Sequence, residues 1–139
     1  MNNLGPIIVV EDNLDDQFII EKALSELEVK NEVMMFPDGL AAYTHLTENT
    51  LEPFMIISDI NMPKMNGMEL EEIIQKDTQA RLFTVPFIFM STSEPSDAII
   101  QSNMKLVHRY FKKPAIFEDY KKTLRGIIDF WSRTGEPYF

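Results

Sequence analysis

The sequence predicts an α/β fold in which five parallel strands form a doubly wound sheet with five helices on its two faces. The first observation is that five short apolar runs, each bounded by polar or turn-forming residues, have the length of buried strands. The second is that the segments following these runs carry apolar residues at helical spacing. Buried strands that alternate with amphipathic helices are typical of a parallel sheet covered on both sides.

The strands are expected where the apolar runs lie. The central one, residues 54–58, reads Phe-Met-Ile-Ile-Ser and leads into Asp59. The first, residues 6–10, leads into Glu11 and Asp12. The remaining strands are expected at residues 33–36, 85–90 and 107–111, with a Pro-Asp-Gly turn after the second and Lys-Lys-Pro closing the fifth.

Each strand is followed by a predicted helix with one apolar face. Asp15 and Asp16 lie where the first turn of the first helix favours negative charge, and Pro95 suits the first turn of the fourth. The apolar stripes of the five helices are Ile20, Ala23, Leu24 and Leu27; Gly39, Ala42, Tyr43 and Leu46; Leu70, Ile73 and Ile74; Ile99, Ile100 and Met104; and Tyr120, Leu124, Ile127, Ile128 and Trp131.

Right-handed crossovers leave few topologies for such a chain, and the flavodoxin-like strand order 2-1-3-4-5 fits best. In this order strands one and three are neighbours at the point where the winding direction reverses. Their carboxyl ends carry Glu11, Asp12 and Asp59. Because ligands of open α/β sheets bind at this edge, we expect a site there.

Composition limits the function further. The formal net charge of −9 argues against binding to nucleic acid, and the chain has no cysteine for disulfides or thiolate zinc sites. No apolar run is long enough to cross a bilayer, and the N-terminus lacks a basic signal region, so we expect a cytoplasmic protein without membrane contact. One domain over residues 1–139 is expected, with residues 1–5 as a tail and 132–139 extending the last helix.

Three carboxylates gathered at one sheet edge would repel one another unless a cation compensates them. Oxygen ligands with room for water and phosphate favour Mg²⁺. An alternative interpretation is that Glu11 and Asp12 merely cap the helix that follows, and that the third strand happens to end in Asp59.

Residues 59–67 read Asp-Ile-Asn-Met-Pro-Lys-Met-Asn-Gly, and this segment resembles the phosphoacceptor segment of bacterial two-component response regulator receiver domains. The fixed positions Asp59, Met62-Pro63 and Gly67 all match. The acidic pair after strand one, Ser91 and Lys113-Pro114 agree with the same family in order along the chain.

This resemblance implies that Asp59 accepts a phosphoryl group from a sensor histidine kinase or a histidine phosphotransfer protein, with Mg²⁺ as cofactor. Asp12 and Asp59 would bind the metal directly, and Glu11 would support it partly through water. The backbone carbonyl of Asn61 would complete the set. The implied role is that of a signalling domain that catalyses its own phosphorylation and dephosphorylation, not that of an enzyme.

The resemblance also assigns the residues that handle the phosphoryl group. Lys113 would pair with Asp59 and then with the phosphoryl oxygens, and its peptide bond to Pro114 would be cis. Ser91 would donate its hydroxyl, with Tyr110 as the aromatic that moves inward. Asn61 and Ser93 would tune dephosphorylation.

Some features depart from the family pattern. Thr92 replaces a usually small residue, and Leu106-Val107 replaces the usual Gly-Ala. The tail beyond Phe130 extends the final helix and is similar to that of stand-alone regulators paired with bacterial phytochromes. Its aromatic residues Phe130, Trp131, Tyr138 and Phe139 predict an exposed apolar patch. We therefore expect a homodimer through helix four, strand five and helix five.

Other functions on this fold remain alternatives. A haloacid dehalogenase-type phosphatase also phosphorylates an Asp, but it needs a second Asp where Asn61 stands. A flavin or nucleotide binder would need a phosphate-binding loop after strand one, where Glu11 and Asp12 have the wrong charge. A degenerate receiver that acts only as an interaction module is the third alternative.

Overall fold

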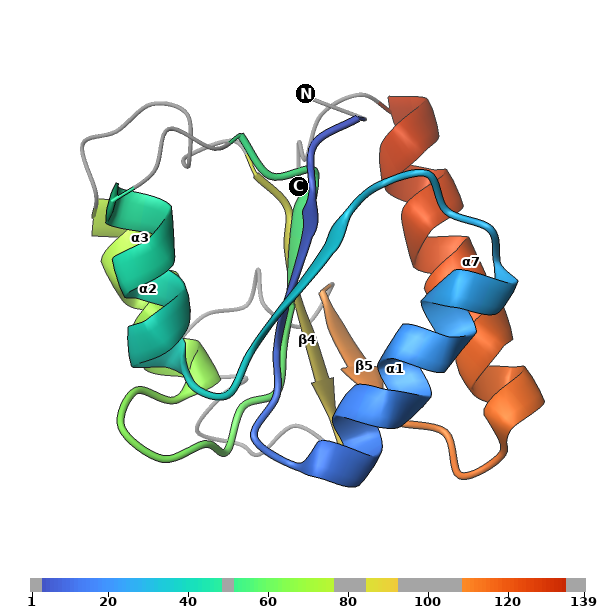
Figure 1. Ribbon diagram of the computed structural model, residues 1–139, viewed down its shortest axis with the longest axis horizontal. Coiled ribbons are helices and arrows are strands. Elements are labelled where there is room, and N and C mark those ends of the chain that lie inside the picture. Colours follow the sequence, from blue (N-terminus) through green and yellow to red (C-terminus); the bar gives the residue numbers. More distant parts are fainter. Residues whose placement is uncertain (1–3, 49–51, 77–84, 93–108, 135–139) are drawn as a thin grey trace.

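The computed structural model describes residues 4–48, 52–76, 85–92 and 109–134 (Figure 1). One parallel sheet has the strand order β2-β1-β3-β4-β5, as predicted. Its strands are β1 (Ile7–Val10), β2 (Val33–Phe36), β3 (Met55–Ser58), β4 (Phe87–Ser91) and β5 (Tyr110–Lys112). The helices within the described ranges are α1 (Leu14–Glu26), α2 (Gly39–Glu48), α3 (Gly67–Lys76) and α7 (Phe117–Thr134).

The predicted boundaries need small corrections. Ser91 is the last residue of β4 and Lys112 the last of β5, although both were expected just after a strand. The helix expected around Ile99 lies outside the described residues, as do positions 106 and 107 and the tail beyond 134. No helix in the described part of the chain is long and apolar enough to cross a membrane.

The two faces of the sheet have separate hydrophobic cores because successive strand residues point to opposite sides. Helices α1 and α7 cover one face, and α2 and α3 cover the other (Figure 1). Ile7 and Val9 of β1 join the first core, whereas Ile8 and Val10 join the second. Burying one side chain of this size stabilises the fold by about 1.5–3 kcal/mol.

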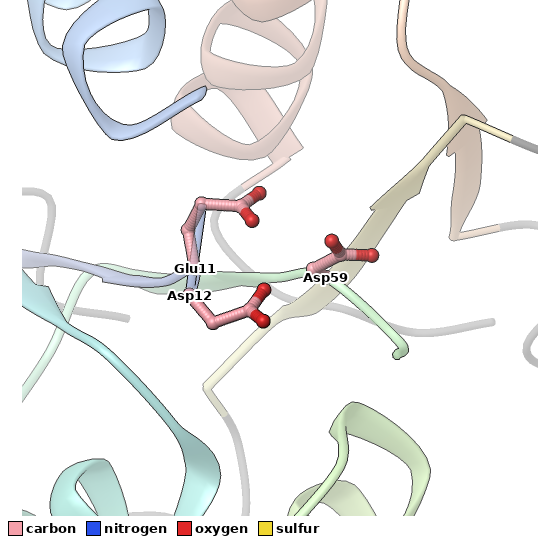
Figure 2. A group of neighbouring side chains, drawn as sticks. All are labelled: Glu11, Asp12 and Asp59. Atoms are coloured by element: carbon pink, nitrogen blue, oxygen red, sulfur yellow. The ribbon is translucent and has the colours of Figure 1, made fainter. Parts of the chain in front are cut away.

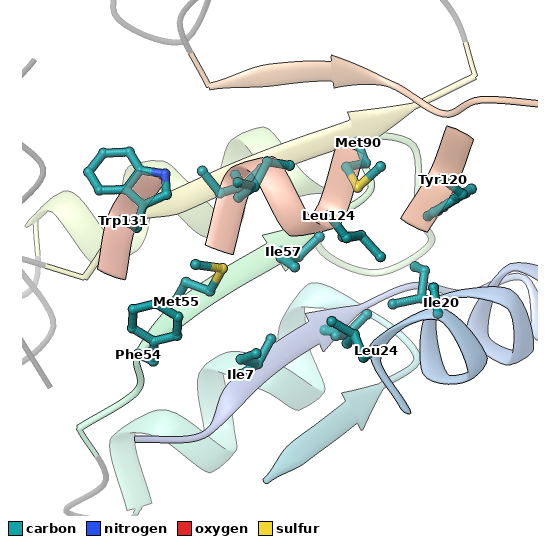
Figure 3. Packing of buried hydrophobic residues seen from close by; sticks show 14 residues of the cluster. Ile7, Ile20, Leu24, Phe54, Met55, Ile57, Met90, Tyr120, Leu124 and Trp131 are labelled. Atoms are coloured by element: carbon teal, nitrogen blue, oxygen red, sulfur yellow. The ribbon is translucent and has the colours of Figure 1, made fainter. Parts of the chain in front are cut away.

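The long helix α7 is held by its apolar stripe. Tyr120, Leu124, Ile127 and Trp131 are all buried against β1, β3 and α1 (Figure 3). The prediction that Trp131 belongs to an exposed patch is therefore wrong. At helical spacing it falls in line with Leu124 and Ile127 and completes the core, whereas the adjacent Phe130 is 42 % exposed.

Strand register brings the ends of the central strands level. Val10 pairs with Phe36 in β2 and with Ser58 in β3. The backbone N–H of Asp59 then donates to the Val10 carbonyl at 3.0 Å. The residues after β1 and β3 therefore leave the sheet side by side.

Capping residues fix where the helices begin. Asn13 caps α1 by accepting a hydrogen bond from the Asp16 N–H at 3.0 Å. Asn66 and Glu69 exchange side chain to backbone bonds of 2.9 and 3.0 Å, which forms a capping box at the start of α3. The starts of α1 and α3 are thus both fixed by hydrogen bonds from local side chains.

Candidate functional site

Three carboxylates meet at the carboxyl edge of the sheet. Glu11 and Asp12 follow β1, and Asp59 follows β3 (Figure 2). Each offers an oxygen, and these oxygens lie within 4.8 Å of one another. Glu11 is buried, Asp59 is half-buried and Asp12 is exposed, so one side of the group faces solvent. The donor set is all oxygen, which fits a hard divalent cation.

Lys113 binds two of these three carboxylates. Its Nζ donates to Glu11 Oε1 at 2.6 Å and to Asp59 Oδ2 at 3.2 Å, and its side chain is only 4 % exposed. The backbone N–H of Lys113 donates to the Ser91 carbonyl at 2.7 Å. The last bond extends the pairing of β4 with β5 and so sets the position from which the side chain reaches across.

A fourth carboxylate, that of Asp16, also contacts the lysine. Its Oδ2 accepts from Lys113 Nζ at 3.0 Å. The sequence interpretation gave Asp16 only a favourable charge at the start of α1. Helical spacing could not have indicated this contact, because Asp12 precedes the extended Asn13 cap and lies outside α1.

Burial and pairing shift the pKa values of this cluster in directions that matter for chemistry. Burial raises the pKa of Glu11 from 4.5 to about 7, and the hydrogen bond from Lys113 opposes the rise. Burial by itself would lower the pKa of Lys113, but its hydrogen bonds to Glu11 and Asp16 raise this pKa above its ordinary value. Lys113 is therefore an ammonium at neutral pH, in contact with the carboxylates of Glu11, Asp16 and Asp59.

The loop after Asp59 is shaped around its backbone. Asp59 Oδ1 accepts from the Ile60 N–H at 2.6 Å, and the Gly67 N–H donates to the Ile60 carbonyl at 2.9 Å. A Cβ at Gly67 would collide with the Asp59 carbonyl oxygen, so this position requires glycine. Lys64 takes a positive φ of 55° within the same loop.

The remaining predicted residues lie around the cluster at different depths. Ser91 is buried at the end of β4, and Tyr110 is half-buried at the start of β5, packed against the core of α2 and α3. Asn61 is exposed beside Asp59, and Ser93 lies outside the described residues.

The expected cis bond before Pro114 is a wrong prediction. The Lys113–Pro114 peptide is trans in this structure. The trans isomer is the intrinsic preference of an X-Pro bond by about 0.5–1 kcal/mol.

The fold and the cluster together define a class of protein. A family model described as the response regulator receiver domain matches residues 7–125, most of the chain. The chain therefore belongs to the response regulator receiver family and is a receiver domain of two-component signal transduction.

Individual relatives cover nearly the whole chain. Response regulator Rcp1 of Synechocystis sp. is 33 % identical over 134 residues, which is 92 % of this chain and 89 % of the relative. The solved structure of the phosphorylated cyanobacterial phytochrome response regulator RcpA superposes with a TM-score of 0.80 at 32 % identity, covering 94 % and 95 % of the two chains. The solved structure of the Mn²⁺-bound form of Rcp1 superposes with a TM-score of 0.76 at 30 % identity, and the match covers 91 % of this chain and 94 % of that structure.

Proposed function

We propose that Asp59 is the phosphoacceptor of this receiver domain and that its donor is a phosphohistidine on a sensor kinase or a phosphotransfer protein. One observation carries the proposal: the Asp59 carboxylate contacts the Lys113 ammonium at 3.2 Å and has an oxygen within 4.8 Å of oxygens of the two carboxylates that follow β1. An anionic nucleophile beside both an ammonium and an acidic, cation-binding group suits the transfer of a negatively charged phosphoryl group.

The transfer is a displacement at phosphorus. An Asp59 oxygen forms the new P–O bond while the P–N bond to the donor histidine breaks, and the histidine nitrogen keeps the electron pair. Lys113 moves its ammonium from the Asp59 oxygen to a phosphoryl oxygen, which requires a shift of only a few ångströms. Glu11, Asp12, Asp59 and the Asn61 carbonyl would hold Mg²⁺, which supplies charge compensation for the phosphoryl oxygens when bound.

The response to phosphorylation would begin at Ser91 and Tyr110. Ser91 ends β4 and Tyr110 begins β5, one on each of two paired strands. A hydroxyl drawn toward the phosphoryl group at Ser91 would leave space that the Tyr110 ring can take up, which moves the outer face of β5. Asn61, exposed beside Asp59, and Ser93 would control the approach of the water that hydrolyses the acyl phosphate.

The donor needs an apolar surface next to the cluster, and α1 offers one. Leu14 and Phe18, one turn apart on α1, are 77 % and 68 % exposed, and Ile116 after β5 is 62 % exposed. The contact between Lys113 and Asp16 holds the segment leading to Ile116 beside the first turn of α1. We infer that this apolar surface docks against the helices that present the donor histidine.

A second partner would be another copy of this chain. A groove of about 510 Å³ along α7 and β5 has apolar lining from Phe111, Ile127, Phe130 and Trp131. Charges of both signs occur along α7, among them Lys122, Arg125 and Asp129, and mixed charge suits a self-complementary two-fold contact. The net charge of −9 supports protein partners over nucleic acid.

Phosphorylation with a small donor tests the proposed acceptor. Incubation with acetyl phosphate and Mg²⁺ should add one phosphoryl group, labile in alkali and visible as a mass increase of intact protein. Asp59→Asn should remain unlabelled, whereas Asp12→Asn should be labelled only at much higher Mg²⁺. Equal labelling of wild type and Asp59→Asn would disprove the assignment. A wild-type protein that is never labelled would favour a phosphorylation-independent interaction module.

A further inference from the structure

The ammonium of Lys113 has as many carboxylate partners as it has protons to donate. An ammonium carries three N–H donors, and Lys113 Nζ contacts Glu11 Oε1, Asp16 Oδ2 and Asp59 Oδ2 at 2.6, 3.0 and 3.2 Å. These contacts fix the ammonium in three directions. A change in any one partner therefore shifts the balance among the other two.

Two of the three partners have a competing use. Glu11 and Asp59 belong, with Asp12, to the group of carboxylates that can share a cation, and Asp16 is not part of any such group within the described ranges. If Asp59 is phosphorylated, its bonded oxygen also loses its negative charge. Of the three carboxylates that contact Lys113, Asp16 is thus the one that would keep this contact when a cation binds or Asp59 is phosphorylated.

Asp16 is also well anchored for this use. Its backbone N–H donates to the capping Asn13 side chain at 3.0 Å, in the first turn of α1. The Asp16 side chain is 27 % exposed, compared with 1 % for Glu11. The Asp16 carboxylate therefore keeps part of its hydration while it binds Lys113, so its charge costs less to hold there than that of Glu11.

We propose that Asp16 is a positioning residue that holds the Lys113 ammonium away from the cation-binding oxygens, and so sets the cation affinity of the site. This inference rests on the proposed function of the cluster. Without Asp16, the ammonium would keep only Glu11 and Asp59 as partners and would compete with the cation for both. Asp16 acts here through Lys113 and does not itself contact the cation.

Cation binding tests this directly, with Mn²⁺ as the probe and free Mn²⁺ counted by electron paramagnetic resonance at constant ionic strength. Asp16→Asn should weaken Mn²⁺ binding by about fivefold or more. Asp15→Asn is the matched control, because it removes the same charge from the adjacent exposed residue, which is not among the carboxylates that bind Lys113. It should change the affinity by less than about twofold, as expected for a screened surface charge. Equal effects of the two substitutions would overturn the proposal.

A double-mutant cycle separates action through Lys113 from direct action on the cation. In a Lys113→Met background, Asp16→Asn should have no larger effect than Asp15→Asn, and Asp16→Glu should restore part of the affinity in the wild-type background. A full fivefold loss in the Lys113→Met background would show that Asp16 acts on the cation itself. Circular dichroism of each variant checks that the fold is kept.

The cation measurement also stands apart from phosphorylation. No phosphodonor is present, so failure of acetyl phosphate to label Asp59 would overturn the proposed function without changing the comparison of Asp16 with Asp15.

Discussion

At the residue scale, the site combines a buried carboxylate with a buried ammonium, and their contact offsets the cost of burying each charge. Glu11 is 1 % exposed and would be costly to keep charged without its 2.6 Å contact to Lys113. The same contact keeps Lys113 close to Asp59. The Lys113 ammonium therefore lies beside the proposed phosphoacceptor, Asp59, before any metal ion or phosphoryl group binds.

Removal of the Lys113 side chain should lower the stability of the fold, because Glu11 loses the partner that offsets its burial. We expect Lys113→Ala to lower the free energy of unfolding by about 2–4 kcal/mol without divalent cation, because it leaves Glu11 buried without its partner. Saturating Mg²⁺ should shrink the difference, since the cation can compensate the same carboxylates. Urea unfolding with and without Mg²⁺ measures both values, and Lys112→Ala, in the exposed neighbouring residue, is the control. An equal loss at both Mg²⁺ levels would argue for a packing role of the Lys113 stem.

Glu11 should also give the cation-free protein a pH dependence. Its pKa is 4.5 when unfolded and about 7 when buried in the fold, so between these values the folded protein binds more protons than the unfolded chain. The free energy of unfolding contributed by this residue therefore falls as the pH rises from about 4.5 and levels off above about 7.

Two measurements isolate this contribution from that of other groups. The difference in urea midpoint between wild type and Glu11→Gln should change across this pH interval and be constant above it. Because a metal ligand must be deprotonated, Mg²⁺ affinity of the wild type should rise over the same interval. A difference between the two proteins that is independent of pH would rule out a raised pKa at Glu11.

At the element scale, α1 connects the site to a docking surface. Its first two turns carry Asp16, which binds Lys113, and the exposed pair Leu14 and Phe18. This end of α1 thus contacts the cluster through Asp16 and exposes two apolar side chains to solvent.

Loss of these apolar side chains should separate two routes of phosphorylation. The double variant Leu14→Ser, Phe18→Ser should reduce transfer from a phosphorylated kinase or phosphotransfer domain by about tenfold or more, because central apolar anchors dominate such interfaces. Labelling by acetyl phosphate should be unchanged, since the small donor needs no docking surface. Leu40→Ser, at an exposed position on α2, is the control and should alter neither rate. Slower labelling by both donors would indicate damage to the cluster instead.

Much of this organisation can be predicted from sequence because it depends on local patterns. The strands β1 and β3 are buried on both faces and read as continuous apolar runs, and the topology rules then place Glu11, Asp12 and Asp59 together. Lys113 follows from the family motif.

Contacts that cross the fold are harder to predict. The bond from Lys113 to Asp16 joins residues far apart in the chain, and an acidic residue in a first helical turn already has a sufficient local explanation. Trp131 was misassigned for a similar reason: its position in the tail suggested exposure, while its helical spacing from Leu124 places it in the core.

At the scale of the whole molecule, β5 joins the site to the groove on the outer surface. Lys113 directly follows β5, and Phe111 within β5 lines the groove with Phe130 of α7. Movement of Lys113 toward a phosphoryl group would therefore be transmitted to the groove through only two residues of chain. A homodimer formed there should bind more tightly when Asp59 is phosphorylated.

Sedimentation velocity over a range of protein concentrations, with and without phosphodonor, measures this coupling. Wild type should shift toward dimer when the donor is added, and Phe130→Ser should weaken dimerisation by about tenfold, since a partly exposed aromatic at the groove is a typical anchor. The variant spares Trp131, which belongs to the core, so the fold should be retained. Phe18→Ser, in an exposed residue of α1 that does not line the groove, is the control and should dimerise like wild type. A wild-type protein that stays monomeric at high concentration in both states would exclude the homodimer and leave the groove for a different protein.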